Sequence, residues 1–153
     1  MEVHLVLAMH GAPPNDFPRN EITELFSLSV AALDAKVRAW PRTPRNDPYH
    51  AAALALGEEL EKATGHKVIV AFNEFCAPTL DEALDQAAAR GVEKVVVVTP
   101  MTTRGGEHSE VEIPNAVKRA EERHPGTSFV YVWPLEAAEV ARFLAGQIQR
   151  FLS

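Results

Sequence analysis

The sequence predicts an α/β domain with a four-stranded parallel β-sheet and helices on both faces, on the basis of two observations. The first is a set of four short, valine-rich apolar runs, at residues 3–9, 67–72, 94–100 and 128–133. They are mostly continuous rather than alternating, which is typical of parallel strands buried on both sides. The second is that helical patterns separate these runs, and such alternation gives a parallel sheet with right-handed crossovers.

Helices are expected where apolar residues recur at helical spacing. These segments are 21–39, 49–64, 79–90, 112–124 and 136–152. The second segment ends at Gly65, and the third begins with Thr79 and Glu82 in a capping-box pattern. We expect the apolar stripe of the last segment to face the core. That stripe consists of Val140, Phe143, Leu144, Ile148 and Phe151.

The connection after the first strand is longer than a βα unit requires. Residues 13–50 supply a proline-rich turn, an extra helix and the loop WPRTPRNDP. The arginines here, Arg38, Arg42 and Arg45, make this region locally basic in an acidic chain. We therefore expect a single domain over residues 1–153, with an insertion at about 13–50.

Composition and charge exclude several classes of protein. A chain of 153 residues, 46% of them hydrophobic, fits one domain with a single core. No apolar run approaches the roughly 20 residues that span a membrane, and the N-terminal stretch lacks the features of a signal peptide. The net charge of -6 argues against general nucleic-acid binding. A single cysteine, Cys76, excludes an internal disulfide, so we expect a cytoplasmic protein without nucleic-acid or membrane partners.

Residues that follow the strands are the candidates for chemistry, because ligands of parallel α/β sheets bind beyond the carboxyl ends of the strands. His10 follows the first strand, Glu74 the second, and His108 and Glu112 lie after the third. Two imidazoles and a carboxylate suit a divalent ion such as cobalt, iron, nickel or zinc, and they equally suit proton transfer. Each residue also has a structural alternative: a loop histidine, a capping glutamate, or an acidic residue in the first turn of a helix.

Three motifs match one family in order and spacing. The segment MHGA at 9–12 is similar to a Gly-His-Gly-Ser-like motif. The segment FNEFCAPTL at 72–80 is similar to a Phe-Leu-Glu element followed by Pro-Ser/Thr-Leu. The segment GGEHSEVEIP at 105–114 is similar to a histidine loop that ends in Asp-Ile-Pro. The chain resembles the small class II metal chelatases of tetrapyrrole synthesis, the sirohydrochlorin cobaltochelatase and ferrochelatase group. The resemblance covers residues 1–12 and about 50–150.

This resemblance implies a chelatase-like, flavodoxin-like three-layer fold. It also implies an enzyme that inserts cobalt, iron or nickel into a tetrapyrrole such as sirohydrochlorin, in cobalamin or siroheme-type biosynthesis. The divalent metal ion would be a substrate, and no organic cofactor is expected. Metal binding and catalysis fall on His10, Glu74 and His108, with Glu112 in a supporting position.

Substrate contacts are expected at five further positions. Without a side chain, Gly11 would let a flat ring approach the backbone. The basic side chains would receive the carboxylates of sirohydrochlorin through paired hydrogen bonds. These residues are Arg38, Arg42, Arg45 and Arg104.

Alternatives to a chelatase remain open from the sequence. Departures from the family motif at Met9 and Ala12, together with the insertion, fit a non-catalytic metal-binding or tetrapyrrole-binding module. A histidine phosphatase is disfavoured because Met9 stands where those enzymes have an arginine, and a flavin or dinucleotide binder lacks its glycine-rich fingerprint. A homodimer is expected because larger chelatases pair two such halves. The apolar stripe of residues 22–37 would pack on the sheet, form that interface, or cover the ring.

Overall fold

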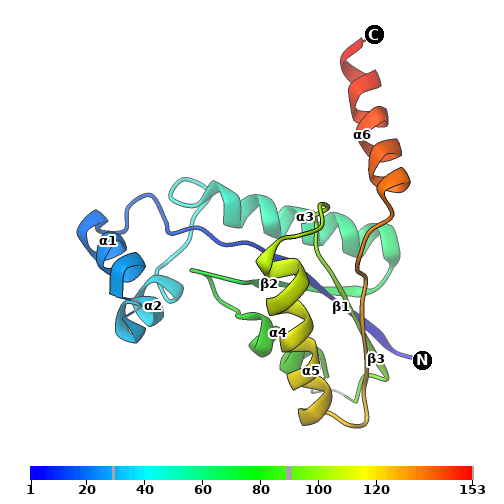
Figure 1. Ribbon diagram of the computed structural model, residues 1–153, viewed down its shortest axis with the longest axis horizontal. Coiled ribbons are helices and arrows are strands. Elements are labelled where there is room, and N and C mark those ends of the chain that lie inside the picture. The colour runs from blue at the N-terminus through cyan, green and yellow to red at the C-terminus, as the bar shows by residue number, and fades with distance from the viewer. Residues whose placement is uncertain (29, 89–90, 153) are drawn as a thin grey trace.

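The computed structural model describes residues 1–28, 30–88 and 91–152, and it has the expected parallel sheet (Figure 1). Its strands are β1 (Val3–Met9), β2 (Lys67–Phe72), β3 (Lys94–Val98) and β4 (Ser128–Tyr131), in the order β2-β1-β3-β4. All three pairings are parallel. The predicted four-stranded parallel α/β fold is confirmed. The chain order reverses at β1, so the switch point of the sheet lies at the end of the strand that precedes His10.

The helices are α1 (Arg19–Leu28), α2 (Ala31–Arg38), α3 (Pro48–Thr64), α4 (Leu80–Ala88), α5 (Ile113–Arg123) and α6 (Ala137–Leu152). A π-helical turn at His108–Glu112 leads into α5. Two caps follow from local sequence. The carboxylate of Asp47 accepts a hydrogen bond from the backbone N–H of His50 at 2.9 Å, and Thr79 and Glu82 form the reciprocal bonds of a capping box. Within the described residues, no helix is long and apolar enough to cross a membrane.

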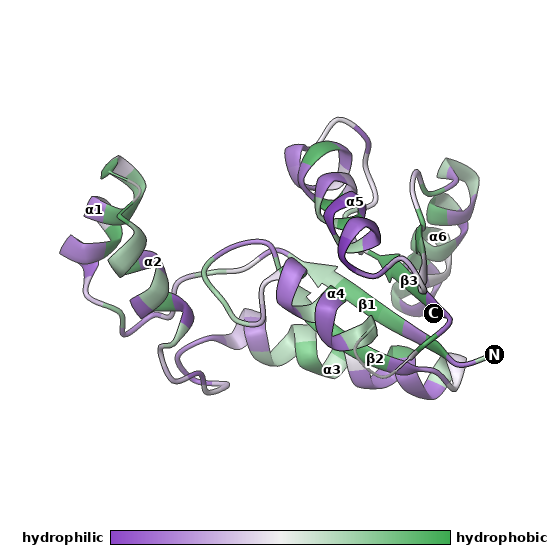
Figure 2. Cartoon of the chain, turned by 90° about the horizontal axis from the view of Figure 1, so that it is seen from below, coloured by the Kyte–Doolittle hydropathy of each residue, from purple (hydrophilic) through white to green (hydrophobic). Residues whose placement is uncertain are grey.

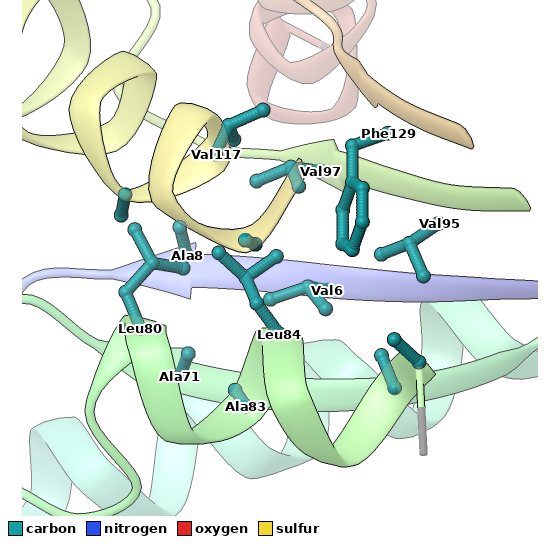
Figure 3. Packing of buried hydrophobic residues seen from close by; sticks show 14 of the residues in the cluster. Val6, Ala8, Ala71, Leu80, Ala83, Leu84, Val95, Val97, Val117 and Phe129 are labelled. Atoms are coloured by element: carbon teal, nitrogen blue, oxygen red, sulfur yellow. The ribbon is translucent and has the colours of Figure 1, made fainter. Parts of the chain in front are cut away.

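Both faces of the sheet carry helices. On one face, Leu84 of α4 and Val117 of α5 pack on Val6 of β1 and Val97 of β3 (Figure 3). On the other face, α3 lies against β2, and Ala53 packs with Leu7, Met9 and Phe72. Figure 2 shows most of β1 as hydrophobic, as expected for a central strand buried on both sides. This rigid centre holds the strand ends in register.

The insertion differs from the prediction. Residues 21–39 form two helices rather than one, and Val30, which has an extended conformation, precedes α2. The α1–α2 hairpin lies at one end of the molecule, away from the sheet (Figures 1 and 2). Its apolar stripe does not pack on the sheet, because the two short helices close around Phe17, which forms a small separate core with Leu25 and Val37.

The last helix also differs from the prediction. We expected its apolar stripe to face the core, but none of the residues 137–152 is buried. Phe143 is 63% exposed and Phe151 is 86% exposed. Figure 1 shows α6 projecting away from the sheet, because the chain continues outward after β4 instead of turning back across it.

Candidate metal centre at the carboxyl edge of the sheet

Three elements bring His10, Glu74 and His108 together. His10 directly follows β1, Glu74 lies in the loop after β2, and His108 begins the π-helical turn that follows the β3 loop. One ligand atom from each of these residues lies within 4.8 Å of the others. Since β1 and β2 are adjacent and parallel, their last residues meet at one edge of the sheet, and the β3 loop folds back over that edge.

The Glu74 carboxylate lies between the two imidazoles. Its Oε1 is 3.6 Å from Nδ1 of His10 and 3.3 Å from Nε2 of His108. The two rings are 4.7 Å apart between centroids and meet edge to face at 72°. Two nitrogen atoms and one oxygen atom at this spacing surround a position that one divalent cation would fill with coordination sites left open. The arrangement suits transient binding of a metal ion better than a closed structural site.

His108 is oriented by a second carboxylate. Its Nδ1 atom hydrogen-bonds to Glu112, one turn later, so that Nε2 is directed at Glu74. Burial alone would lower the pKa of His108, but the hydrogen bond to Glu112 and the charge of Glu74 outweigh it, and the pKa is raised above its ordinary value. A carboxylate on the far nitrogen of a metal-binding imidazole fixes its tautomer and makes it a stronger base.

A hollow of about 290 Å³ opens beside the two histidines. It is lined by His10, His108 and residues of the β3 loop, namely Met101, Thr102, Thr103, Gly106, Glu107 and Ser109. A larger hollow of about 720 Å³ lies within the insertion, and it is lined by none of the three candidate ligands. The smaller hollow is therefore the approach to the candidate metal centre.

Gly11 has a different role from the one expected. A Cβ atom at this position would stand 1.6 Å from the backbone oxygen of Glu74. The space beside Gly11 is already filled by the β2 loop, so it does not serve the approach of a planar ring. A backbone hydrogen bond also joins the two segments: the N–H of Asn73 donates to the carbonyl of Met9 at 2.9 Å. Phe75, which follows Glu74, adopts a positive φ of 59°. Gly11 allows the loops that carry His10 and Glu74 to touch.

Arg42 also differs from its expected role. Its guanidinium is almost completely buried, and it pairs with the buried carboxylate of Asp47. It donates further hydrogen bonds to the carbonyls of Ala12 at 2.7 Å, Val37 at 2.7 Å and Phe75. Ala12 follows His10 by two residues and Phe75 follows Glu74 directly, so Arg42 ties the insertion to both loops instead of facing a substrate. The role of Asp47 as the buried partner of Arg42 was not predicted from the sequence, where it is only the acidic residue of a basic loop.

The other expected arginines lie in separate places. Arg38 donates to Asp34 at 2.8 Å and to the Cys76 carbonyl at 2.9 Å, and it lines a hollow of about 420 Å³ that Glu112 also lines. Arg104 is exposed on the β3 loop and pairs with Glu110. Arg45 lines the large hollow of the insertion. Of these three arginines, Arg38 is the one that lines a hollow together with Glu112, the hydrogen-bond partner of His108.

Comparison with known proteins identifies the family. A family model described as CbiX matches residues 44–150. The chain belongs to the CbiX family. The match includes Glu74, His108 and Glu112, whereas His10 and most of the insertion precede it.

Relatives in the CbiX family are similar over shorter stretches. A sirohydrochlorin cobaltochelatase of Priestia megaterium is 37% identical over 70 residues, which are 46% of this chain and 22% of that protein. A sirohydrochlorin cobaltochelatase of Methanothermobacter thermautotrophicus is 34% identical over 74 residues, which are 43% of this chain and 51% of that protein. The matched stretches thus span about half or less of these relatives. The crystal structure of a CbiX protein from Marinobacter aquaeolei VT8 has the same fold, with a TM-score of 0.64, 18% identity, and coverage of 99% of this chain and 96% of that one.

Proposed function

We propose that the protein is a chelatase that inserts a divalent metal ion, cobalt in the first instance, into sirohydrochlorin. The observation that carries this proposal is the convergence of His10, Glu74 and His108 at the carboxyl edge of a CbiX-family sheet, with ligand atoms within 4.8 Å of one another. The names of the similar relatives, sirohydrochlorin cobaltochelatases, supply the metal and the ring. Iron and nickel are the other candidate metals, since imidazole binds all three.

The three side chains would hold the metal ion loosely before its transfer. Glu74 and His10 are partly exposed, and the set provides only three ligands, so coordination positions stay open toward the hollow. A metal ion held by an incomplete set can exchange those ligands for ring nitrogens. We propose that the ring enters from the hollow that His10 and His108 line.

The two histidines would also receive the pyrrole protons. Insertion of a doubly charged ion into the neutral ring releases two N–H protons, so the total charge is unchanged. As each metal–imidazole bond gives way to a metal–pyrrole bond, the freed imidazole nitrogen becomes available as a base. Glu112 would stabilise the protonated form of His108 through their hydrogen bond. Glu74 lies between both rings and would remain with the departing ion the longest.

For the carboxylates of the substrate, we propose Arg38 as the principal contact and Arg104 and Arg45 as outer contacts. The hollow beside Arg38 adjoins Glu112 and also contains Asn73 and Asn115, which add amide groups. Arg104 would have to leave its pairing with Glu110. We propose further that the enzyme works in the cytoplasm as a homodimer without an organic cofactor.

The decisive assay follows the absorption change when sirohydrochlorin is incubated with Co²⁺ and the protein. We expect a rate well above that of the His10→Ala, His108→Ala double variant. His66→Ala is the matched control, since His66 is exposed at the start of β2, at the opposite edge of the sheet. A wild-type rate equal to that of the double variant would reject the chelatase and favour a metal-binding or tetrapyrrole-binding module. Parallel assays with Fe²⁺ and Ni²⁺ then rank the metals.

A further inference from the structure

The edge strand β4 carries none of the three candidate ligands, but its last residue contacts the turn that carries one of them. The hydroxyl of Tyr131 donates a hydrogen bond to the backbone carbonyl of Ser109 at 3.0 Å. Ser109 is the second residue of the π-helical turn, it follows His108 directly, and it is 1% exposed. Tyr131 therefore reaches the metal centre from β4, through the residue next to a candidate ligand.

The carbonyl of Ser109 lacks a helical donor for a reason that lies in the sequence. Hydrogen bonds in a π-helical turn join residues five apart, and here the N–H of Ile113 donates to the carbonyl of His108. The matching donor for Ser109 would be the N–H of residue 114, but that residue is a proline and has none. A buried carbonyl without a partner is costly. The hydroxyl of Tyr131 replaces the bond that Pro114 cannot make.

The surroundings of the Tyr131 ring fix the position of its hydroxyl. Tyr131 pairs with Val97 in the β3–β4 ladder, and its side chain packs against the main core. Trp133 stacks on it, with ring centroids 6.1 Å apart and an angle of 8° between the planes. Burial and, second, the charge of Glu110 raise the pKa of Tyr131 to about 12. The hydroxyl therefore stays protonated and remains a hydrogen-bond donor at neutral pH.

The π-helical turn sets the direction of the His108 side chain. Its Nδ1 atom hydrogen-bonds to Glu112 within the same turn, and its Nε2 atom lies 3.3 Å from Oε1 of Glu74. If the carbonyl of Ser109 lost its donor, it would compete for the N–H of Ile113, which is four residues away, as in an α-helix. The turn would then tighten, and the His108 imidazole would rotate away from Glu74.

We propose that Tyr131 is a positioning residue of the metal centre: its hydroxyl holds the turn in the π-helical form and thereby keeps Nε2 of His108 directed at Glu74. This role rests on the metal centre proposed above and deepens that proposal, because it gives β4 a part in the site. Tyr131 does not bind the metal ion itself, and it acts through the backbone of Ser109.

The first test compares Co²⁺ binding by the wild type, Tyr131→Phe and Thr127→Val. For Tyr131→Phe we expect the affinity, from isothermal titration calorimetry, to fall by roughly 10-fold, the low end of the loss when a group that supports a metal ligand is replaced. The visible absorption spectrum of bound Co²⁺ should change as His108 leaves the ligand set. Thr127→Val is the matched control, since it removes a hydroxyl that donates to the Val92 carbonyl at 3.0 Å, at the opposite end of β4. An affinity and a spectrum of Tyr131→Phe equal to those of the wild type overturn the proposal.

The second test restores a donor to the carbonyl of Ser109. In Pro114→Ala, residue 114 has an N–H that can donate to Ser109, so the hydroxyl of Tyr131 should no longer be needed. We expect Tyr131→Phe to weaken Co²⁺ binding several-fold less in the Pro114→Ala background than in the wild-type background. A purely structural contribution of Tyr131 would not be rescued in this way. The same loss of affinity in both backgrounds overturns the proposal.

A crystal structure of the metal-free Tyr131→Phe variant separates this inference from the proposed metal centre. We expect the N–H of Ile113 to donate to Ser109 instead of His108, so that Nε2 of His108 no longer faces Glu74. A π-helical turn that is retained in the variant overturns the role of Tyr131, whether or not Co²⁺ binds. A Co²⁺ affinity that is unchanged in His108→Ala would instead reject the metal centre, and the crystal structure would still decide whether Tyr131 holds the turn.

Discussion

The backbone oxygen of Glu74 lies 1.6 Å from the position where a Cβ atom of Gly11 would stand. The loop after β1 therefore lies directly against the loop after β2 at this point. The candidate ligand His10 precedes Gly11 in the first loop, and the candidate ligand Glu74 supplies the oxygen in the second. The 3.6 Å separation between the Glu74 carboxylate and the His10 imidazole therefore depends on a residue that has no side chain. The two loops act as one unit.

Replacing Gly11 tests this contact. We expect Gly11→Ala to force the two loops apart, at a cost of about 1–3 kcal/mol in the free energy of unfolding, as in other overpacked sites. Co²⁺ affinity, measured by isothermal titration calorimetry, should fall because His10 and Glu74 separate. Gly126→Ala is the control, since nothing lies within 4 Å of the added methyl group. Equal Co²⁺ affinity in the two variants would contradict the role assigned to Gly11.

Removal of the Arg42 side chain should destabilise the whole site region. Arg42→Met would leave the buried Asp47 carboxylate without its ion-pair partner and would remove one hydrogen bond from each of three backbone carbonyls. Loss of one partner of a buried pair typically costs about 3–5 kcal/mol. Denaturant unfolding measures this loss. Arg45→Met, at an exposed position in the loop after α2, should change the free energy of unfolding by less than about 0.5 kcal/mol. Similar values for the two variants would show that Arg42 is not a structural tie.

The hydrogen bond between Glu112 and His108 predicts a pH effect on metal binding. Because the pKa of His108 is raised in the folded protein, the stability that this pairing contributes is present at low pH and is lost as the pH rises through that pKa. Protons compete with Co²⁺ for Nε2 over the same range. Glu112→Gln should therefore move the midpoint of Co²⁺ binding to lower pH, while the affinity at high pH falls by about 10-fold or more because the imidazole is a weaker ligand.

The pH titration has a matched control in Glu110→Gln. Glu110 lies in the same π-helical turn but pairs with Arg104 instead of His108. Its replacement should leave the midpoint of Co²⁺ binding where the wild type has it. A midpoint that moves to higher pH in Glu112→Gln, or equally in both variants, would contradict the assignment of Glu112 as the group that raises the pKa of His108.

The sequence allowed prediction of those features that depend on the sheet alone. The valine-rich strands and their order along the chain bring the residues after β1, β2 and β3 to one edge, whatever the loops do, and His10, Glu74 and His108 could be selected on that basis. The role of Arg42 could not, because its hydrogen-bond acceptors Ala12 and Phe75 belong to loops far away in sequence. Helical periodicity also shows which side of a helix is apolar but not which surface covers it. For this reason the prediction that the stripe of α6 faces the core was wrong. Of the three positions left open for the stripe of residues 22–37, packing on the sheet is the one that the structure contradicts.

Arg38 offers the sharpest test of how the substrate is held. It lines the hollow that contains Glu112, on the side of His108 that faces away from Glu74, so a carboxylate bound there would anchor the ring beside the centre. Loss of a charge-assisted hydrogen bond costs about 1.5–3 kcal/mol, so Arg38→Met should raise KM for sirohydrochlorin by roughly 10-fold or more while kcat changes little. Arg104→Met should have a smaller effect on KM, because Arg104 is exposed and already paired with Glu110.

Steady-state kinetics at saturating Co²⁺ separate the effects of these substitutions on KM and kcat. A fall in kcat with an unchanged KM would place Arg38 with Arg42 as a support of the site, since its other hydrogen bond holds the Cys76 carbonyl beside the Glu74 loop.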